Sequence, residues 1–460
     1  MTGSLPRVVI AGTQSGVGKT SLSLALVAAL RRRGMRVQTF KVGPDFLDPS
    51  YLALASGRPC YNLDGWMAGK DYVCRLFGRA SEGADISVIE GVMGLFDGAD
   101  PATSEGSTAE IACWLKAPVL LVASAHGLAR SFAAMVKGYA SFDPSVSVAG
   151  VIANQCGSRE HGEWLAHAMA SSSQPPLLGA IPREAFPKLP SRHLGLVTAD
   201  RENLGPSVLE KLADTLDGHV SAEEIIRLAR SAPLLPLLPS EAVVSNGPRI
   251  GIALDGAFHF YYQDLLDELE FRGCEVIPFS PVADRNVPEG CHALYFGGGY
   301  PEVHADALSA NEPMLESLRR FGASGRPIYA ECGGLMYLSR NLLTLDGKEY
   351  PLVGLLPVSA RMLERKKALG YMEVTLTDHS LWGSRGATLR GHEFHYSEMT
   401  ADPDGVEGWQ SVYSVRRRRP GGVIREGFQR GKLLASYVHL HLASHPEALN
   451  TFIGHCKGGP

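Results

Sequence analysis

The chain has 460 residues, 45% of them hydrophobic, and its 44 basic and 48 acidic side chains leave a formal net charge of −4. This length predicts about two or three domains, each large enough to bury its own core. The charge balance provides no basic surface for nucleic acid or an anionic membrane, and no apolar run is long enough to span a bilayer. We therefore expect an enzyme that acts on small molecules and binds neither nucleic acid nor membrane.

The eight cysteines show no Cys-x-x-Cys pair and no regular framework, so neither a zinc ribbon nor a disulfide scaffold is expected. The amino terminus lacks the charged segment and apolar core of a secretory signal, because strand and loop patterns begin almost at once. Reduced thiols in the cytoplasm are the expectation.

The first predicted element is a strand at residues 8–11, followed by the glycine-rich sequence GTQSGVGKT at 12–20 and a helix at 21–33. Such a loop presents backbone N–H groups to phosphate oxygens, and the helix N-terminus adds partial positive charge. Thr20 is also a candidate Mg²⁺ ligand, because this hydroxyl holds the ion in loops of this kind. The residues that we expect to bind ATP are Gly16, Val17, Gly18, Lys19 and Thr20.

The spacing of this loop departs from the common G-x-x-x-x-G-K-[ST] form, because the position five before Gly18 is Thr13. It resembles the deviant loop of the dethiobiotin synthetase and partition-ATPase group. Partition ATPases usually carry a lysine where this chain has Gln14. The difference favours a metabolic enzyme.

Short apolar runs then alternate with helical patterns, at residues 37–40, 86–89, 119–123 and 148–153. This alternation predicts an α/β domain with a mainly parallel sheet flanked by helices. Ligands gather at the carboxyl ends of such strands, where we place Glu90 as a Mg²⁺ ligand and Lys41 as a partner of phosphate or substrate carboxylate. Asp45 is a further candidate ligand of the same ion.

Three prolines within residues 233–239 interrupt regular structure, because each removes a backbone donor and disfavours helix before it. We therefore predict a linker at 231–247 between a first domain at 1–230 and a second at 248–460. A strand at 249–254, a helix at 262–272 and a strand at 275–279 restart the alternation. The second domain is thus also predicted to be α/β with a mainly parallel sheet.

Cys332 lies between a predicted strand at 326–330 and a helix, with Gly333 directly after it. A lone cysteine is more often a small buried hydrophobe, but a thiol on a sharp strand-to-helix turn has the environment of a nucleophile. Gly298 and Gly299 end another strand, and their backbone N–H groups together with that of Gly333 are candidates for an oxyanion hole.

Two histidines that end a strand near the carboxyl terminus supply a candidate base. We choose His439 to take the thiol proton. His445 is the alternative, but Ser444-x-x-Glu447 with a proline just inside is a helix capping box, so we interpret His445 as structural.

Together these motifs resemble the cobyrinic acid a,c-diamide synthase family, which joins a dethiobiotin-synthetase-like ATPase domain of P-loop NTPase type to a class I glutamine amidotransferase-like domain. The resemblance covers nearly the whole chain. Its marks besides the phosphate loop are KVGPDFLDP at 41–49, NLD at 62–64, EGVMGLFDG at 90–98, RHLGL at 192–196 and ECGG at 331–334.

The resemblance implies two coupled reactions in cobalamin biosynthesis. Cys332 would release ammonia from glutamine, with His439 as the proton carrier. In the first domain Mg²⁺-ATP would phosphorylate the a and c carboxylates of cobyrinate, and ammonia would displace the phosphate. Family members are often dimers, so we expect a homodimer. The candidates for substrate contact are Lys41, Asp48, Asp97, Asp64 and Arg192.

Several points stay open at this stage. Asp64 fits a turn role as well as substrate contact. His441 stands where triad enzymes of this class often have glutamate, so the third member is absent or supplied differently. His392, Glu393 and His395 look metal-like but alternate along a strand, which does not favour a metal site.

Alternative functions are the same chemistry on hydrogenobyrinate or nickel sirohydrochlorin, since motifs for ATP and glutamine do not separate these substrates. Cobyric acid synthase shares both domains, but the segments at 41–49 and 62–64 favour the diamide synthase. A nucleotide-switched partition or scaffold protein with an inactive glutaminase fold is the alternative from another class. Intact Cys332 and His439, and Gln14 in place of lysine, argue against it.

Overall fold

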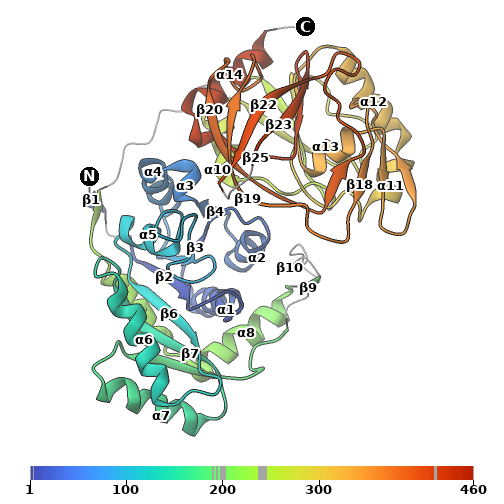
Figure 1. Cartoon of the computed structure of the whole chain (residues 1–460). Coiled ribbons are helices and arrows are strands. Elements are labelled where there is room, and N and C mark those ends of the chain that lie inside the picture. The colour runs from blue at the N-terminus through green and yellow to red at the C-terminus, as the bar shows by residue number, and fades with distance from the viewer. Residues whose placement is uncertain are drawn as a thin grey trace. The chain divides into compact units, whose positions relative to one another are not determined.

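The computed structural model describes residues 2–3, 5–188, 191–192, 195–196, 204–236, 246–418 and 422–458. The chain divides into two compact units, Met1–Ser240 and Glu241–Pro460. Each unit has its own sheets (Figure 1). Each also has its own hydrophobic core.

The first unit is built on a seven-stranded sheet in which every pairing is parallel. Such a sheet is covered on both faces and must be apolar on both, and three central strands are buried at every residue. The predicted parallel sheet is confirmed. In spatial order the strands are β4 (Cys60–Leu63), β3 (Val37–Val42), β5 (Ile86–Glu90), β2 (Arg7–Gly12), β6 (Val119–Ser124), β7 (Val148–Cys156) and β8 (Leu177–Pro182).

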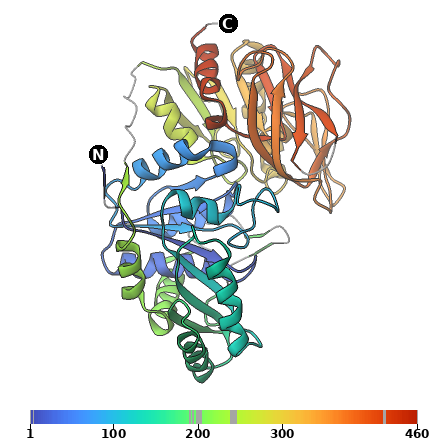
Figure 2. The same cartoon turned by 60° about the vertical axis from the view of Figure 1, so that its left-hand side comes forward.

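Helices cover both faces of this sheet (Figures 1 and 2). The core on one face includes side chains of α1, α2, α8 and α9, the other includes α4 and α5, and α6 and α7 pack on β6 and β7. The predicted helix at 21–33 is confirmed as α1, which begins two residues earlier. The bounds are α1 (Lys19–Arg32), α2 (Leu47–Ser56), α3 (Gly65–Ala68), α4 (Lys70–Ala80), α5 (Thr108–Trp114), α6 (Arg130–Phe142), α7 (Arg159–Ser171), α8 (Pro206–His219) and α9 (Ala222–Arg230).

Short strands lie near the ends of the first unit. β1 (Thr2–Gly3) pairs antiparallel with β11 (Leu235–Pro236), which falls within the predicted linker at 231–247. The buried guanidinium of Arg7 donates to the carbonyl oxygens of Leu115 (2.6 Å) and Pro233 (2.7 Å), which fastens this end of the segment to the sheet. Residues 237–245 of the predicted linker lie outside the described residues. β9 (Ser191–Arg192) and β10 (Gly195–Leu196) form a separate two-stranded ladder.

The second unit contains a ten-stranded sheet whose first five strands in space are parallel and whose other five run antiparallel. The predicted α/β class is confirmed, and the antiparallel half is a feature that the sequence pattern did not indicate. In spatial order the strands are β13 (Glu275–Phe279), β12 (Arg249–Ala253), β14 (Ala293–Phe296), β15 (Ile328–Glu331), β24 (Leu433–Ser436), β23 (Val423–Arg430), β22 (Gln410–Arg417), β19 (Ala368–Leu376), β20 (Thr388–His395) and β25 (His439–His441).

The antiparallel half curls back on itself. Only two residues separate the end of β24 from the start of β25, a reach of about 10 Å at most, yet β25 pairs with β20 at the far end of the sheet. The curl therefore brings β25 back beside β24. It thereby places the histidines of β25 close to the end of β15, the neighbour of β24.

Helices and a small second sheet complete the second unit. The predicted helix at 262–272 is confirmed as α10. Within the ranges that the structure describes, none of the helices is long and apolar enough to cross a membrane. The helices are α10 (Gln263–Phe271), α11 (Ala305–Ala310), α12 (Glu312–Ala323), α13 (Gly333–Leu338) and α14 (Pro446–Lys457), with a 3-10 turn η1 (Leu442–Ser444). The four-stranded sheet has the order β17 (Glu349–Pro351), β16 (Asn341–Leu343), β18 (Ala360–Met362) and β21 (Ser397–Met399).

Candidate active sites

The loop between β2 and α1 adopts a glycine-dependent conformation. Gly16 and Gly18 have φ values of 74° and 101°, in the left-handed region that L side chains rarely adopt. Gly18 also lies against the end of β7, where a Cβ atom would come within 2.4 Å of Asn154 Nδ2. The same amide donates to the carbonyl oxygen of Val17 at 2.8 Å. The neighbouring strand therefore helps to hold the loop in a shape that leaves its N–H groups clear.

Lys19 follows the loop and points back across it. Its Nζ atom donates to the carbonyl oxygens of Met93 (2.5 Å) and Gln14 (3.3 Å). Burial, and then the positive charge of Lys41, lower the pKa of Lys19. The ammonium group is thus held at the loop by neutral carbonyl groups, which triphosphate oxygens can replace.

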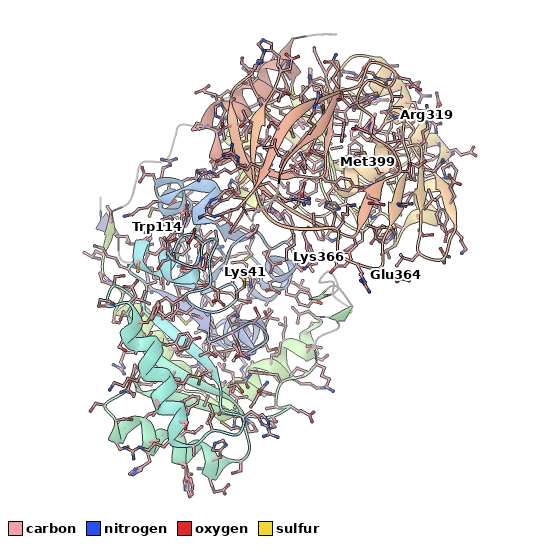
Figure 3. All side chains as sticks on the ribbon, in the orientation of Figure 1. Lys41, Trp114, Arg319, Glu364, Lys366 and Met399 are labelled. Carbon is pink, nitrogen blue, oxygen red and sulfur yellow. The ribbon has the colours of Figure 1, made fainter. Side chains whose placement is uncertain are left out.

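A cluster of charged side chains lies beside the loop, formed by Thr20, Lys41, Asp48 and Glu90; we call it the carboxylate cluster. Lys41, labelled in Figure 3, is buried in β3, with Nζ 2.5 Å from Asp48 Oδ2 and 2.8 Å from Glu90 Oε1. The Thr20 hydroxyl donates to the same Glu90 oxygen at 2.7 Å and lies 3.4 Å from Asp48 Oδ2. The first turn of α1, β3, β5 and the first turn of α2 therefore converge on one point.

The electrostatics of the carboxylate cluster follow from burial and close pairing. Burial opposes the charge of Lys41, but Asp48, Glu90 and Asp45 raise its pKa well above the ordinary value. Burial alone would raise the pKa of Asp48, but the Lys41 ammonium lowers it. Burial raises the pKa of Glu90 despite the same ammonium. Glu90 Oε2 is buried and has no hydrogen-bond partner among the described residues, so this oxygen can accept a further ligand.

The two aspartates at the start of α2 differ in their contacts. Asp45, the residue we expected to bind the metal, accepts the backbone N–H groups of Leu47 (2.8 Å) and Asp48 (3.3 Å), and its other oxygen lies 3.8 Å from Lys41 Nζ. Burial and the neighbouring Asp48 raise the pKa of Asp45 to about 7. Asp48, which we expected to contact substrate, is the one in contact with Thr20.

The other predicted substrate residues of the first unit are more scattered. Asp64 is buried and caps α3 by accepting from the backbone N–H of Met67 at 2.7 Å, which supports its turn role. Asp97 is exposed and accepts from the backbone N–H of Gly94 at 2.8 Å. The side chain of Arg192 lies outside the described residues.

Cys332 occupies a sharp elbow between β15 and α13, as predicted. Its φ and ψ are 47° and −100°, an uncommon conformation for a residue with a side chain. Its backbone N–H donates to the carbonyl oxygen of Ser436 at 2.8 Å, which ties the elbow to the end of β24. The residue is 6% exposed. A strained backbone fixed by a neighbouring strand is a feature of nucleophile elbows.

His439 lies within hydrogen-bonding reach of the elbow. Its Nδ1 atom lies 3.3 Å from Glu331 Oε2, and its ring interacts with the Cys332 side chain. Burial opposes a charged ring, but the bonds with Cys332 and Glu331 raise the pKa of His439 to about 10. The structure therefore brings the predicted nucleophile and the predicted base together.

The three predicted oxyanion-hole glycines lie at the same place. A Cβ atom on Gly298 would come within 2.5 Å of His439 Cε1, and one on Gly333 within 3.0 Å of the Gly299 nitrogen. Their lack of side chains permits this close approach.

His445 is separate from this group of residues. It is the N-cap of α14, with Pro446 at the first helical position. The expected capping role of Ser444 is wrong, because its hydroxyl instead accepts from the backbone N–H of Arg390 at 2.9 Å.

The three residues of the metal-like motif on β20 contact different partners. His392 stacks on His439 with ring centroids 5.0 Å apart, whereas Glu393 faces Arg417 (3.6 Å) and His395 stacks on Tyr437. Across the part of the chain that the structure describes, no group of three or more His, Cys, Asp or Glu side chains is arranged to hold a metal ion.

Two residues near Cys332 were missed from the sequence. Glu331 was only part of a family motif, although its place directly before the nucleophile was a usable signal. Glu426 accepts from the Ser436 hydroxyl (2.5 Å) and the backbone N–H of Tyr437 (2.7 Å), so it holds the segment that leads into β25. Nothing in its local sequence indicated that contact.

Comparisons with known proteins cover both units. Residues 8–197 match the CobQ/CobB/MinD/ParA nucleotide binding domain, and residues 249–447 match the CobB/CobQ-like glutamine amidotransferase domain. The chain is 55% identical to a cobyrinate a,c-diamide synthase of Syntrophotalea carbinolica, over 99% of both chains. It is 42% identical to one of Leptospira interrogans and 40% identical to one of Dehalococcoides mccartyi, in each case over 98% of both chains.

Proposed function

The chain belongs to the cobyrinate a,c-diamide synthase family, and we propose that it amidates the a and c side-chain carboxylates of cobyrinate with ATP and glutamine. The observation that carries this proposal is the match over nearly the full length of both chains at 55% identity. We assign ATP and tetrapyrrole binding to residues 1–230, a linker to 231–247 and glutamine hydrolysis to 248–460. The reaction belongs to cobalamin biosynthesis.

The second unit carries out the glutaminase half of the reaction. His439 takes the proton of the Cys332 thiol, and the sulfur attacks the side-chain amide carbon of glutamine. The backbone N–H groups of Gly298, Gly299 and Gly333 are the proposed donors to the oxyanion. His439 then returns the proton to the departing nitrogen, the carbon–nitrogen bond breaks, and ammonia leaves. Water hydrolyses the remaining thioester to glutamate.

The first unit activates the substrate carboxylate. Residues 16–20 hold the triphosphate, and Lys19 neutralises its charge. A carboxylate oxygen of the substrate attacks the γ-phosphorus, ADP leaves, and an acyl phosphate forms. Ammonia then attacks the acyl carbon and phosphate departs, which leaves an amide. Lys41 is the proposed partner of phosphate or substrate carboxylate, with Asp97 and Arg192 as further substrate contacts.

The carboxylate cluster fits Mg²⁺ because it offers hard oxygen ligands and an unpartnered, buried Glu90 Oε2. Thr20, Glu90 and Asp48 would hold the ion, and Asp45 is a further proposed ligand. When bound, the ion neutralises charge on the β- and γ-phosphates. Lys19, Lys41 and Glu90 are themselves buried.

The identity of the tetrapyrrole substrate is the most specific part of the proposal. Hydrogenobyrinate and nickel sirohydrochlorin carry similar carboxylates, so the test runs all three substrates in parallel with Mg²⁺-ATP and glutamine labelled in its amide nitrogen. Two labelled nitrogens in cobyrinate, found by mass spectrometry, are expected. Label found only in another tetrapyrrole would identify that compound as the substrate. Label in none of them would favour a nucleotide-switched scaffold.

We further propose that the protein works as a homodimer in the cytoplasm and binds neither nucleic acid nor membrane. The net charge of −4 supports the last point. Sedimentation of the purified chain would test the dimer.

A further inference from the structure

We propose that Glu331, the residue directly before the proposed nucleophile, is the positioning residue that orients the His439 ring and stabilises its charged form. The third member of the site would then come from the strand of the cysteine rather than from the strand of the histidine. The inference rests on the proposed glutaminase function of Cys332 and His439.

The Glu331 carboxylate has several donors that fix its direction. It is 3% exposed. On one side, Oε2 lies 3.3 Å from His439 Nδ1 and accepts from the Tyr295 hydroxyl at 3.0 Å. On the other side, Oε1 accepts from the Tyr329 hydroxyl at 2.6 Å and the backbone N–H of Leu440 at 3.2 Å. A carboxylate with such bonds on both oxygens is held in one orientation, with Oε2 toward the imidazole.

Two strands meet to make this contact. β15 ends at Glu331, which pairs with Ser436 at the end of β24, and the chain then turns within two residues into His439. The backbone N–H of Leu440 binds the same carboxylate as its neighbour His439. Glu331 therefore fixes both the start of β25 and the ring that β25 carries.

His441 does not take this place. It occupies the position where related triad enzymes often have glutamate, but its Nε2 atom lies 3.5 Å from Asp264 Oδ2, and its ring packs on Tyr262 with centroids 4.7 Å apart. His441 thus belongs to a different group of buried polar side chains, which does not include Glu331. In this chain the acid that faces His439 Nδ1 is Glu331, on β15.

The chemical consequence is a fixed tautomer. A carboxylate facing Nδ1 favours the proton on that nitrogen, so Nε2 is left to accept the thiol proton of Cys332. Once the ring is charged, the buried negative charge of Glu331 stabilises the imidazolium and with it the thiolate. The proton stays on the ring and returns from Nε2 to the departing ammonia. Glu331 itself gains no proton.

The test is Glu331→Gln, which keeps the shape but removes the charge and places an amide where Nδ1 needs an acceptor. Iodoacetamide labels the full-length protein over a range of pH, and mass spectrometry follows the peptide that contains Cys332. We expect the labelling rate at neutral pH to fall by about 10²-fold, with the half-maximal rate moved to higher pH. Turnover of glutamine (kcat) should fall similarly with little change in KM, and amidation with ammonium salts should persist.

Glu275→Gln is the matched control, because it removes a carboxylate charge of the second unit away from the elbow. Glu275 begins β13 and lies 3.0 Å from Arg249 Nε, at the amino ends of the parallel strands, whereas Cys332 follows the carboxyl end of β15. The labelling profile of this variant should stay close to that of the wild type. A wild-type profile for Glu331→Gln, or an equal loss in both variants, would overturn the inference.

Tyr295→Phe keeps the carboxylate but removes one donor from the oxygen that faces His439. It keeps the inference testable if Glu331→Gln does not fold. A loss of a few fold in glutamine kcat is expected, since one hydrogen bond contributes about 1 kcal/mol. An unchanged kcat and labelling profile would contradict the proposed role.

Labelling requires no glutamine, so the two proposals can fail separately. Glu331-dependent labelling in a wild-type protein that hydrolyses no glutamine would support the positioning role while it refutes the proposed glutaminase.

Discussion

The sites of the two units differ in how much of their working geometry exists without a ligand. In the second unit, His439 already lies 3.3 Å from Glu331 and interacts with Cys332, and Gly298 lies against its ring. In the first unit, Lys19 binds carbonyl groups of its surroundings and Lys41 is held between Asp48 and Glu90. These contacts of Lys19 and Lys41 in the first unit must be exchanged when charged ligands bind.

This difference has a physical basis. In the second unit the Glu331 carboxylate lies beside His439 and helps to raise the pKa of the ring, so side chains of the protein itself balance the charge of the imidazole without a ligand. The proposed ATP site of the first unit must bind an anion, and without one the buried Lys41 ammonium is paired with Asp48 and Glu90. Variants of the two sites should therefore fail in different ways.

The largest effect is expected from Cys332→Ala. It should abolish amidation with glutamine yet leave amidation with ammonium salts near the wild-type rate, because the first unit is untouched. Lys19→Ala should remove both activities, since it acts on phosphoryl transfer. Product formation from each nitrogen source is the measurement. Loss of ammonium-dependent activity in the Cys332 variant would refute the separation of the two sites.

Gly298→Ala should reduce glutamine turnover by about 10²-fold, because its methyl group would displace the imidazole of His439, the proposed general base. Gly454→Ala is the control: a Cβ atom there meets nothing within 4 Å, and the residue lies within α14. That variant should keep its turnover and gain slightly in stability. Equal turnover in both variants would argue against a tightly packed base.

Lys41→Met tests the charge balance of the first unit. Removing the buried ammonium leaves Asp48 and Glu90 unpaired, which should cost about 3–5 kcal/mol of stability. Added Mg²⁺ should restore part of the loss by replacing the missing positive charge. Thermal unfolding with and without the ion measures both, with the exposed Lys137→Met of α6 as control. An unaltered midpoint would show that the carboxylates do not depend on Lys41.

The smallest effect concerns pH and Glu426. Burial raises its pKa from 4.5 to about 8, so the folded state holds this proton more tightly than the unfolded state does. Stability from this group is therefore full below about pH 4.5 and is lost as the pH rises toward 8. Glu426→Gln should flatten the decline, raising stability relative to the wild type more at mildly alkaline than at acidic pH. Parallel curves from thermal melts would contradict the shift.

The sequence predicted best what local pattern determines. Short apolar runs and adjacent glycines predicted the strand and loop before α1 and the elbow at Cys332. They also predicted β13, whose observed bounds equal the predicted range 275–279. The contact of Asp48 rather than Asp45 with Thr20 depends on where α2 begins, because Asp45 precedes the helix and Asp48 lies in its first turn. Sequence spacing does not resolve this.

The contacts that the sequence did not predict are long-range. Glu331 and His439 are 108 positions apart and meet only because the antiparallel strands curl back to β24. That curl depends on pairing between β20 and β25, for which no local pattern exists. A motif can therefore indicate a candidate nucleophile while leaving the proposed positioning residue, Glu331, undetermined.

The most direct test of the difference between the sites is glutamine hydrolysis by the wild-type protein without ATP or tetrapyrrole. A preassembled second unit predicts release of ammonia and glutamate that disappears in Cys332→Ala. Hydrolysis that begins only after Mg²⁺-ATP and cobyrinate are added would contradict it and show that the glutaminase site is completed by ligands of the first unit.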